Sequence, residues 1–321
     1  MDRQLSLEFA RITEQAALKS ARLVGLGDKE GADQAAVDGM HEQFALTPVS
    51  GTVVIGEGEI DEAPMLYIGE HVGQGGEEVD IAVDPVEGTN LVAKGKNGAI
   101  AVLAIAPKGC LLHAPDMYMQ KICVGPRAKG RIDIRASVTE TLKNVADAMG
   151  REVSDLTMVI LDRERHEKII REAREAGARV YLITDGDVVP SVDCGIQGSG
   201  IHMVMGSGGA PEGVLSAVGL KCLGGDMQAR LLPQTEQEIQ RLHTMGIYDP
   251  NKVLTLDDLV KGDDCIFAET AITDCAMLRG VRFFGGGART STLVLRYKTG
   301  TVRFIDTVHR FGEDKPGVRM F

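Results

Sequence analysis

A chain of 321 residues is longer than one ordinary hydrophobic core, so its length predicts two domains. Its 44% apolar and 25% charged residues are typical of a soluble globular protein and exclude a disordered chain. The formal net charge of −11 disfavours nucleic acid or an anionic membrane surface as the main partner. An anionic substrate stays compatible with that charge, because a cation held by carboxylates inverts the local field.

The N-terminal segment predicts two helices. Residues 3–24 place their apolar side chains on one helical face, and glycines at 25 and 27 end that helix. A second helix carries Val37, Met40 and Phe44 after a polar loop. Asp33 then lies near the first turn of that helix, where a carboxylate is favoured.

Three strands are predicted next, over 52–55, 79–84 and 99–106. In the second of them Val79, Ile81 and Val83 alternate with Asp80, Ala82 and Asp84, the period-two pattern of a half-buried strand. Proline cannot donate to a sheet ladder, so we expect this strand to end at Pro85, with Asp84 at or near its carboxyl end.

From about residue 156 the pattern changes to strands over 156–161, 180–183 and 201–205, with a charged helix over 165–177. This alternation is typical of βαβ units, whose ligands gather at the carboxyl ends of the strands. Strands over 265–269, 292–297 and 301–306 are expected to complete the same sheet. The sequence therefore predicts an α+β metal- and phosphate-binding domain over 1–155 and an α/β substrate domain over 156–321.

The segment Asp84-Pro-Val-Glu87-Gly88-Thr89-Asn90 carries the clearest chemical signal. It places two carboxylates, a hydroxyl and a glycine turn directly after a strand. Carboxylate oxygens suit Mg²⁺ or Mn²⁺ rather than zinc, which prefers His and Cys. Glu57, which also follows a strand, is the best further ligand, and Asp33 is another candidate. The alternative interpretation of Glu57 and Glu59 is a pair of solvated loop charges.

Thr89 is a candidate for orienting a metal-bound water for attack on phosphorus. The backbone amides of residues 88–90 are candidates for holding the phosphate oxygens. An ordinary turn or helix cap explains Gly-Thr equally well. A phosphorylated polyol could be bound by residues elsewhere in the chain, namely Lys29, Tyr118, Arg163 and Arg165. The two arginines also fit the exposed start of a helix.

The run Gly206-Ser-Gly-Gly-Ala-Pro-Glu-Gly lies between a strand and a helix that starts near Pro211. It does not fit a dinucleotide loop, because Glu212 places a negative charge where a pyrophosphate would bind. A carboxylate at this position is either a metal ligand or a residue that compensates the helix dipole. Asp185-Gly186-Asp187 could accept hydrogen bonds from sugar hydroxyls or form a plain strand-end turn.

The six cysteines have neither Cys-x-x-Cys pairing nor the spacing of a disulfide-dense module, so we expect reduced, mostly buried thiols. With no signal-peptide or membrane-spanning pattern, a cytoplasmic location is expected. His113, His202 and His243 lack the spacing of metal ligands and are interpreted as packed or surface residues.

The Asp84–Thr89 run resembles the Asp-Pro-[Ile/Leu]-Asp-[Gly/Ser]-[Thr/Ser] signature of the lithium-sensitive sugar and inositol phosphatases, with Glu87 in place of the second Asp. That departure, with the segments starting at Gly56, Ala114 and Gly208, is similar to the class II (GlpX-type) fructose-1,6-bisphosphatases of bacteria. The resemblance runs from the N-terminal helix to near residue 310.

The resemblance implies a mixed α and β, two-domain layered α-β-α-β-α sugar-phosphatase fold. It also implies Mn²⁺- or Mg²⁺-dependent hydrolysis of the 1-phosphate of fructose 1,6-bisphosphate. The metal ligands that it implies are Asp33, Glu57, Asp84, Glu87 and Glu212. The catalytic residues that it implies are Thr89, Asp33 and Glu57, the last two being metal ligands as well. The residues expected to contact substrate are Lys29, Glu87, Gly88, Thr89, Tyr118, Arg163, Arg165, Asp185, Gly186, Asp187 and Gly209.

Three functions remain open at this point. One is a phosphatase acting on fructose 1,6-bisphosphate alone or also on sedoheptulose 1,7-bisphosphate. The others are a nucleotide-binding oxidoreductase, against which Glu212 argues, and an inactive sugar-phosphate sensor, which would be expected to lack a ligand. A homo-oligomer is expected, and regulation by nucleotides or redox is not readable from the sequence.

Overall fold

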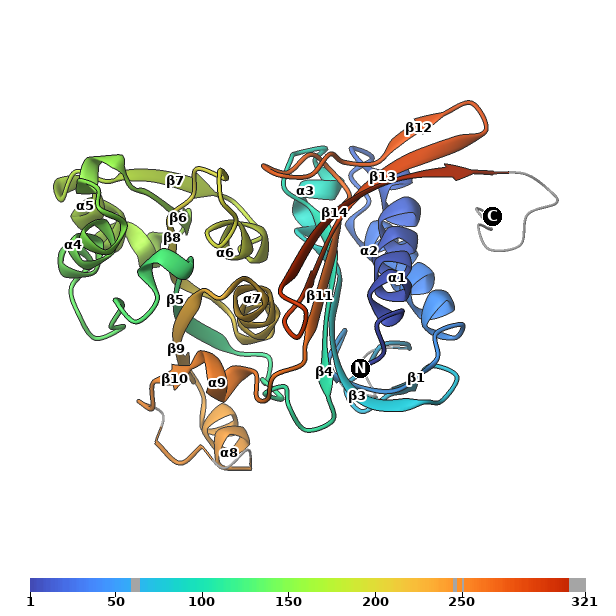
Figure 1. Cartoon of the computed structure of the whole chain (residues 1–321), viewed down its shortest axis with the longest axis horizontal. Helices are drawn as coiled ribbons and strands as arrows, with labels where there is room; N and C mark the ends of the chain where they lie inside the picture. The colour runs from blue at the N-terminus through green and yellow to red at the C-terminus, as the bar shows by residue number, and fades with distance from the viewer. Residues whose placement is uncertain (59–63, 245–246, 250, 312–321) are drawn as a thin grey trace. The chain divides into compact units, whose positions relative to one another are not determined.

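The chain folds as two α/β units in a computed structural model that describes residues 1–58, 64–244, 247–249 and 251–311 (Figure 1). The first unit combines residues 1–110 with the segment from 263 onward, and the second comprises residues 111–262. This confirms the mixed α and β class. Glu59 and its neighbours up to residue 63 lie outside the described residues.

The first unit is built on a mixed sheet whose described strands follow the order β12-β13-β11-β4-β3-β1-β2, with β14 paired to β13. Its strands are β1 (Val49–Ile55), β2 (His71–Val72), β3 (Glu77–Glu87), β4 (Ile100–Pro107), β11 (Ile266–Ala271), β12 (Arg282–Phe284), β13 (Gly287–Arg296) and β14 (Thr301–Arg310). Its helices are α1 (Leu5–Ser20), η1 (Ala21–Leu23), α2 (Lys29–Phe44) and α3 (Thr89–Ala93).

Helices α1 and α2 lie side by side over one face of this sheet (Figure 1). Phe9, Ile12 and Met40 are fully buried there against the odd-numbered residues of β4. A chain of hydroxyl contacts fixes α1 on the sheet: Thr13 Oγ1 lies 2.7 Å from that of Thr270 in β11, which lies 2.8 Å from that of Thr292 in β13. The apolar face predicted for the first helix is therefore confirmed.

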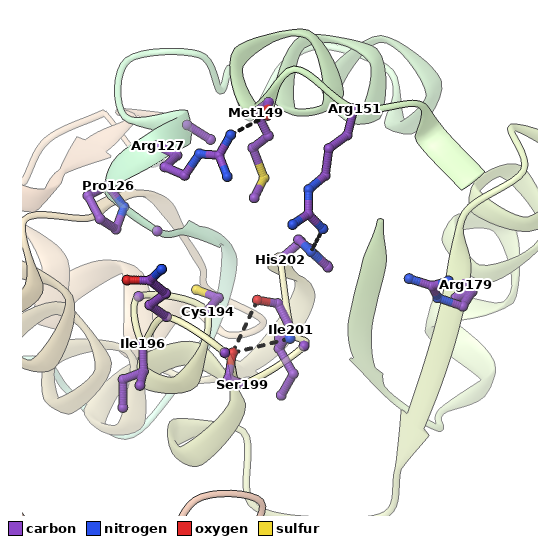
Figure 2. Close-up of a pocket in the computed structure, with 16 residues that line it drawn as sticks. Pro126, Arg127, Met149, Arg151, Arg179, Cys194, Ile196, Ser199, Ile201 and His202 are labelled. Carbon is purple, nitrogen blue, oxygen red and sulfur yellow. Dashed lines mark hydrogen bonds between the residues drawn. The ribbon is translucent and has the colours of Figure 1, made fainter. Parts of the chain in front are cut away.

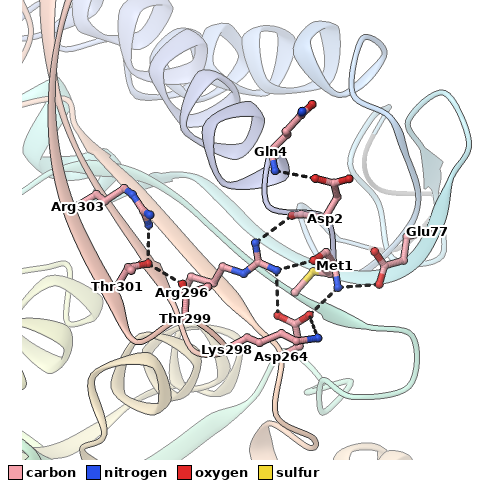
Figure 3. Close-up of polar contacts among 10 residues, drawn as sticks. All are labelled: Met1, Asp2, Gln4, Glu77, Asp264, Arg296, Lys298, Thr299, Thr301 and Arg303. Carbon is pink, nitrogen blue, oxygen red and sulfur yellow. Dashed lines mark hydrogen bonds and ion pairs between the residues drawn. The ribbon is translucent and has the colours of Figure 1, made fainter.

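An ionic cluster ties the start of the chain to the same sheet (Figure 3). The Met1 amino group lies 2.6 Å from Asp264 Oδ2 and 2.9 Å from Glu77 Oε1. Arg296 of β13 donates to the backbone carbonyls of Met1 and Asp2. The returning segment from residue 263 is thus held by the N-terminal residues as well as by strand pairing.

Strand β3 passes through Pro85 and ends at Glu87, so the predicted end at Pro85 is wrong. The register of β3 against β4 shifts between Asp84 and Glu87, and the pairing of β3 with β1 extends only to Ala82. Proline is tolerated because this irregularity does not require its missing N–H. The irregular stretch carries both carboxylates of the heptapeptide.

The second unit has a sheet whose described strands follow the order β10-β9-β5-β8-β6-β7. Its strands are β5 (Tyr118–Val124), β6 (Thr157–Leu161), β7 (Arg179–Ile183), β8 (Met203–Gly209), β9 (Asp226–Leu232) and β10 (Leu254–Thr255). Its helices are η2 (Pro126–Ala128), α4 (Val138–Met149), η3 (Val153–Asp155), η4 (Glu164–His166), α5 (Glu167–Glu175), α6 (Val188–Asp193), α7 (Ala210–Leu223), α8 (Glu236–Thr244) and α9 (Leu256–Leu259). Helices α4 and α5 cover one face of the sheet, and α6 and α7 cover the other (Figure 1).

The two units differ from the division expected at residue 155, which falls inside the second unit. Strand β5 lies between β8 and β9, so residues 118–124 belong with the later sheet. Strand β11 pairs with β4 in the first unit, from Ile266 opposite Ile105, and β13 and β14 follow it there. The three late strands therefore do not complete the second sheet. Among the described residues, no helix is long and apolar enough to cross a membrane.

Candidate active site

The end of β3 brings two carboxylates together. Carboxylate oxygens of Asp84 and Glu87 lie within 4.8 Å of each other. Asp84 Oδ1 also accepts a hydrogen bond of 3.1 Å from the Val86 N–H, which fixes the turn between the two residues. Glu87 is buried, with 6% of its surface exposed, and Asp84 is half-buried. Two acidic groups this close and this desolvated favour a bound cation.

A second carboxylate pair lies in the same unit. Asp33 of α2 and Glu57, which follows β1, share a hydrogen bond. Burial, then the charge of Asp33 and this hydrogen bond, raises the pKa of Glu57 to about 8. Burial also raises the pKa of Asp33, although the hydrogen bond to Glu57 and the charge of Lys29 act in the opposite direction. Without a cation, the pair holds a proton between its two carboxyl groups.

The sheet topology places one carboxylate of each pair, Glu57 and Asp84, at the same end of the strands. Strands β1 and β3 are parallel neighbours with Ile55 opposite Ala82. Glu57 and Asp84 each come two residues after that paired position, so both lie at the carboxyl ends of these neighbouring strands. Helix α2 begins at Lys29 because the Asp28 side chain accepts a hydrogen bond from Gly31 N and caps it. Asp33 is consequently the fifth residue of α2 and lies just after its first turn, close to the predicted place.

Gly88 and Thr89 form the turn after Glu87. Gly88 has φ +92°, a left-handed conformation that side chains rarely adopt, and a Cβ there would lie 2.9 Å from Leu91 Cδ1. Thr89 is half-buried and begins α3 directly after this glycine. Gly88 therefore allows the tight turn that links Glu87 to Thr89, the next residue but one in the chain.

In the second unit the strand ends gather basic and aromatic groups. Arg163 donates to the carbonyls of Asp162 and Thr184, at 2.9 and 2.8 Å, and so joins the ends of β6 and β7. Arg165 donates to Ser207 Oγ and O at 3.0 and 2.9 Å. Its guanidinium also lies 4.9 Å from the centre of the Tyr118 ring, which is 48% exposed. The ends of β6, β7 and β8 lie side by side, as the βαβ alternation predicted.

Lys121 is a member of this cluster that the sequence analysis missed. Its side chain is fully buried in β5, and Nζ donates to Asp187 Oδ1 at 2.8 Å. Burial lowers the pKa of Lys121, but the charges of Asp187 and Glu212 outweigh burial and raise it. A lysine in a strand is usually read as an exposed residue, and only the placement of β5 within the sheet reveals its burial.

Glu212 lies in the first turn of α7, and its carboxylate folds back over Gly209. A Cβ at Gly209 would lie 1.8 Å from Glu212 Oε2, and one at Gly208 would lie 2.5 Å from Asp187 Oδ2. Glu212 Oε2 is buried without a hydrogen-bond partner among the described residues. Burial raises the pKa of Glu212, Lys121 opposes this, and Asp187 adds to it. Gly208 and Gly209 therefore leave the space that the carboxylates of Asp187 and Glu212 occupy.

The predicted glycine loop at 206–213 is instead strand up to Gly209, paired with β5 from Tyr118 to Lys121, and helix from Ala210. Such a segment leaves no loop to wrap a dinucleotide phosphate.

Of the other predicted contacts, Lys29 is exposed and interacts with Asp33 one helical turn away. Gly186 has φ +76° in the turn between Asp185 and Asp187, which leads into α6.

His166 fixes the end of β8. Its Nε2 accepts a 2.9 Å hydrogen bond from Ser207 N, so the ring proton is on Nδ1 and is donated to Leu161 O at 2.8 Å. Burial, followed by the charges of Arg165 and Arg163, lowers the pKa of His166 despite the opposing contact with Leu161. The neutral ring thus positions Ser207, which in turn holds Arg165.

Comparison with known proteins shows which family the chain is similar to. The family model described as "Bacterial fructose-1,6-bisphosphatase, glpX-encoded" matches residues 3–309. A Synechococcus protein (strain JA-2-3B'a(2-13)) named D-fructose 1,6-bisphosphatase class 2/sedoheptulose 1,7-bisphosphatase is 50% identical over 100% of both chains. Proteins with that name from Acaryochloris marina, numbered 2 there, and from Trichodesmium erythraeum are each 47% identical, over 98% of this chain and 98% and 99% of their own.

Proposed function

The chain belongs to the glpX-encoded bacterial fructose-1,6-bisphosphatase family, and from this premise we propose how its residues perform the reaction. It is a fructose-bisphosphatase, a hydrolase of phosphoric monoesters, and acts on fructose 1,6-bisphosphate. We assign the cleavage to the 1-phosphate. The observation that carries the residue assignment is the convergence of two carboxylate pairs at the carboxyl edge of β1 and β3.

The carboxylates fit a hard divalent cation, Mn²⁺ or Mg²⁺. Their donor atoms are all oxygens, and the Asp33–Glu57 pair retains a proton that a cation would displace. Asp84 and Glu87 supply the second pair. Glu212 is proposed as the fifth ligand, supported by its buried, unpartnered Oε2. When bound, such cations neutralise phosphate charge and lower the pKa of water.

Around this centre Thr89 is proposed to orient the attacking water. Its position at the first residue of α3 supports the amides of residues 88–90 as proposed contacts to phosphate oxygens. Asp33 and Glu57 are proposed as catalytic residues as well, with one of the two carboxylates accepting the proton of that water. The attack needs no phosphorylated side chain.

The second unit is proposed to hold the rest of the sugar phosphate. Arg163 and Arg165 would donate to the phosphate that is not cleaved, and Tyr118 offers a hydroxyl beside Arg165. Lys29, Glu87, Asp185, Gly186 and Gly209 stay predicted contacts. Asp187 is already engaged by Lys121, which supports an indirect role, since its Oδ1 is occupied.

The relatives' names include sedoheptulose 1,7-bisphosphatase, and we propose that this chain also accepts that substrate. A cytoplasmic location is supported by the absence of a disulfide bond among the six cysteines, all of which are described residues. A homo-oligomer is supported by the exposed apolar row of Val302, Phe304 and Val308 on β14.

Phosphate release from a panel of sugar phosphates, with and without Mn²⁺, tests this assignment. Fructose 1,6-bisphosphate should be hydrolysed only with the cation, and inositol monophosphate should be hydrolysed poorly. Sedoheptulose 1,7-bisphosphate decides between one substrate and two. Retention of a nicotinamide dinucleotide with no phosphate release would instead support the oxidoreductase.

A further inference from the structure

Arg230, in strand β9 of the second unit, is a basic residue that has no role in the function proposed above. Its side chain is half-buried, and Nη2 donates to Gln120 Oε1 of β5 at 2.8 Å. Its Nε is buried without a hydrogen-bond partner among the described residues. The guanidinium therefore contacts a neutral amide, and none of the described carboxylates forms an ion pair with it. A cation that is partly removed from water in this way favours a bound anion.

Strand pairing places Arg230 beside the proposed substrate cluster. Gln120 of β5 lies opposite Arg230 on one side and opposite Ser207 of β8 on the other. Side chains that are paired across a sheet point to the same face, so these three form one row. Ser207 is the residue that holds Arg165. With strands about 4.8 Å apart, Arg230 and Ser207 are separated by roughly 10 Å, with Gln120 between them.

Two guanidinium groups thus approach β5 from its two neighbouring strands. The guanidinium of Arg165 lies 4.9 Å from the centre of the Tyr118 ring, and Arg230 contacts Gln120. Tyr118 and Gln120 are two residues apart in β5, so they share a face, and their Cα atoms are separated by roughly 7 Å. A phosphate above this stretch of β5 is within reach of both arginines, and each offers several N–H donors in a planar fork.

We propose that Arg230 binds the phosphate that is not cleaved, together with Arg165, and thereby selects sugar bisphosphates over sugar monophosphates. This inference rests on the function proposed above, in which Arg165 and Tyr118 contact that phosphate. The phosphate supplies the counter-charge of Arg230 and an acceptor for its Nε. Gln120 is a positioning residue, because its amide orients the guanidinium without neutralising it.

Steady-state hydrolysis of two substrates by the full chain with Mn²⁺ tests the proposal. Fructose 1,6-bisphosphate carries both phosphates, whereas fructose 1-phosphate carries only the one that is cleaved. Arg230→Gln should lower kcat/KM for the bisphosphate about 10- to 100-fold, mainly through KM, because a charge-assisted hydrogen bond to substrate is lost. The same variant should keep kcat/KM for fructose 1-phosphate within about 2-fold of wild type, since that substrate never contacts Arg230.

Two further variants separate a substrate contact from a structural role. Arg230→Lys should recover part of the loss with the bisphosphate, because it keeps the charge but not the planar fork. Gln120→Ala should raise KM for the bisphosphate less than Arg230→Gln does. Combining Gln120→Ala with Arg230→Gln should be no worse than Arg230→Gln alone, because Gln120 acts through Arg230. Should Arg230→Gln fail to fold, Arg230→Lys carries the same comparison of substrates.

Arg179→Gln is the matched control. Arg179 also has neutral hydrogen-bond partners, Asp155 O and Thr157 Oγ1. It begins β7 and lines a cavity that lies roughly 13 Å from the carboxyl end of that strand (Figure 2). The control should keep wild-type constants for both substrates.

The proposal is overturned if the folded Arg230→Gln protein keeps its KM for fructose 1,6-bisphosphate within about 2-fold of wild type. It is equally overturned if that variant loses activity to the same extent with both substrates, because the effect would then not depend on the second phosphate. Failure of the wild-type protein to hydrolyse fructose 1,6-bisphosphate with Mn²⁺ would instead contradict the function proposed above, and the wild-type assay distinguishes the two.

Discussion

Lys121 and Asp187 form a buried ion pair, with Nζ 2.8 Å from Oδ1, between the middle of β5 and the start of α6. The pair lies beneath Gly208, since a Cβ there would come within 2.5 Å of Asp187 and 3.4 Å of Lys121. Lys121 also acts electrostatically on Glu212. One lysine thus balances two carboxylates next to the proposed substrate cluster.

Replacement of this lysine should destabilise the protein strongly. Lys121→Met leaves Asp187 buried without its counter-charge, a change that typically costs about 3–5 kcal/mol. The free energy of unfolding from urea denaturation measures it. Lys121→Met/Asp187→Asn should recover much of the loss, because no unpaired charge of Asp187 remains. Lys108→Met, which removes an exposed lysine paired with Glu78, should have no measurable effect. Equal stability of Lys121→Met and wild type would contradict this account of the pair.

Gly209→Ala should impair metal binding while preserving the fold. The added Cβ would overlap Glu212 Oε2, so the carboxylate must leave its position over the start of α7. We expect Mn²⁺ affinity to fall at least about 10-fold, as measured by titration calorimetry. Gly285→Ala is the matched control, because a Cβ there meets nothing within 4 Å. Unchanged Mn²⁺ affinity in Gly209→Ala would remove Glu212 from the proposed ligands.

Metal saturation should raise the melting temperature of the wild-type protein. Within each pair of the first unit, Asp33 with Glu57 and Asp84 with Glu87, the carboxylates are close together and at least half-buried, and a cation relieves their repulsion. Free Mn²⁺ at 100 times its dissociation constant would stabilise the folded state by about 2.7 kcal/mol. Asp84→Asn should lose most of this shift, as differential scanning calorimetry can show. A shift that is the same in both proteins would place the cation elsewhere.

Asp193, at the end of α6, should make stability depend on pH. Burial raises the pKa of Asp193 to about 7, and both of its carboxylate oxygens lack a hydrogen-bond partner among the described residues. Because the folded pKa exceeds the unfolded value of about 3.9, this contribution to stability is fully present below about pH 4 and is lost as pH rises through about 7.

Asp193→Asn removes that titration. Relative to wild type, its free energy of unfolding should rise with pH, by up to about 4 kcal/mol across the interval, since one pKa unit corresponds to about 1.4 kcal/mol. Urea denaturation of both proteins at pH 5 and pH 8 measures the difference. Parallel stabilities at the two pH values would show that Asp193 is ionised without cost.

Local sequence patterns predicted the elements that carry the first carboxylates. The alternation at Val79, Ile81 and Val83 correctly gave β3, and the segment after it holds Asp84 and Glu87 as expected. Pro85 misled the prediction of the strand's end, because proline costs little where the ladder is already irregular. Periodicity reports which face of a strand is buried but not how the ladder is interrupted.

The pairing of strands that lie far apart in the chain could not be predicted from the sequence. The sequence predicted a strand over 265–269, yet nothing local distinguishes β4 from a strand of the second sheet as its partner. For the same reason Lys121 went unnoticed, since its burial depends on β8 and β9 pairing on both sides of β5. Glu212 was found because Pro211 marks a helix start, where an acidic residue is conspicuous.

Phosphate release by Asp84→Ala with fructose 1,6-bisphosphate and saturating Mn²⁺ tests the central claim most directly. The proposed site loses a ligand at the end of β3, so kcat/KM should fall at least about 1,000-fold while circular dichroism shows an intact fold. Glu78→Ala, on the same strand but exposed, should retain wild-type activity. Turnover by the folded, metal-saturated Asp84→Ala protein within 10-fold of wild type would contradict the assignment of these carboxylates to the metal site.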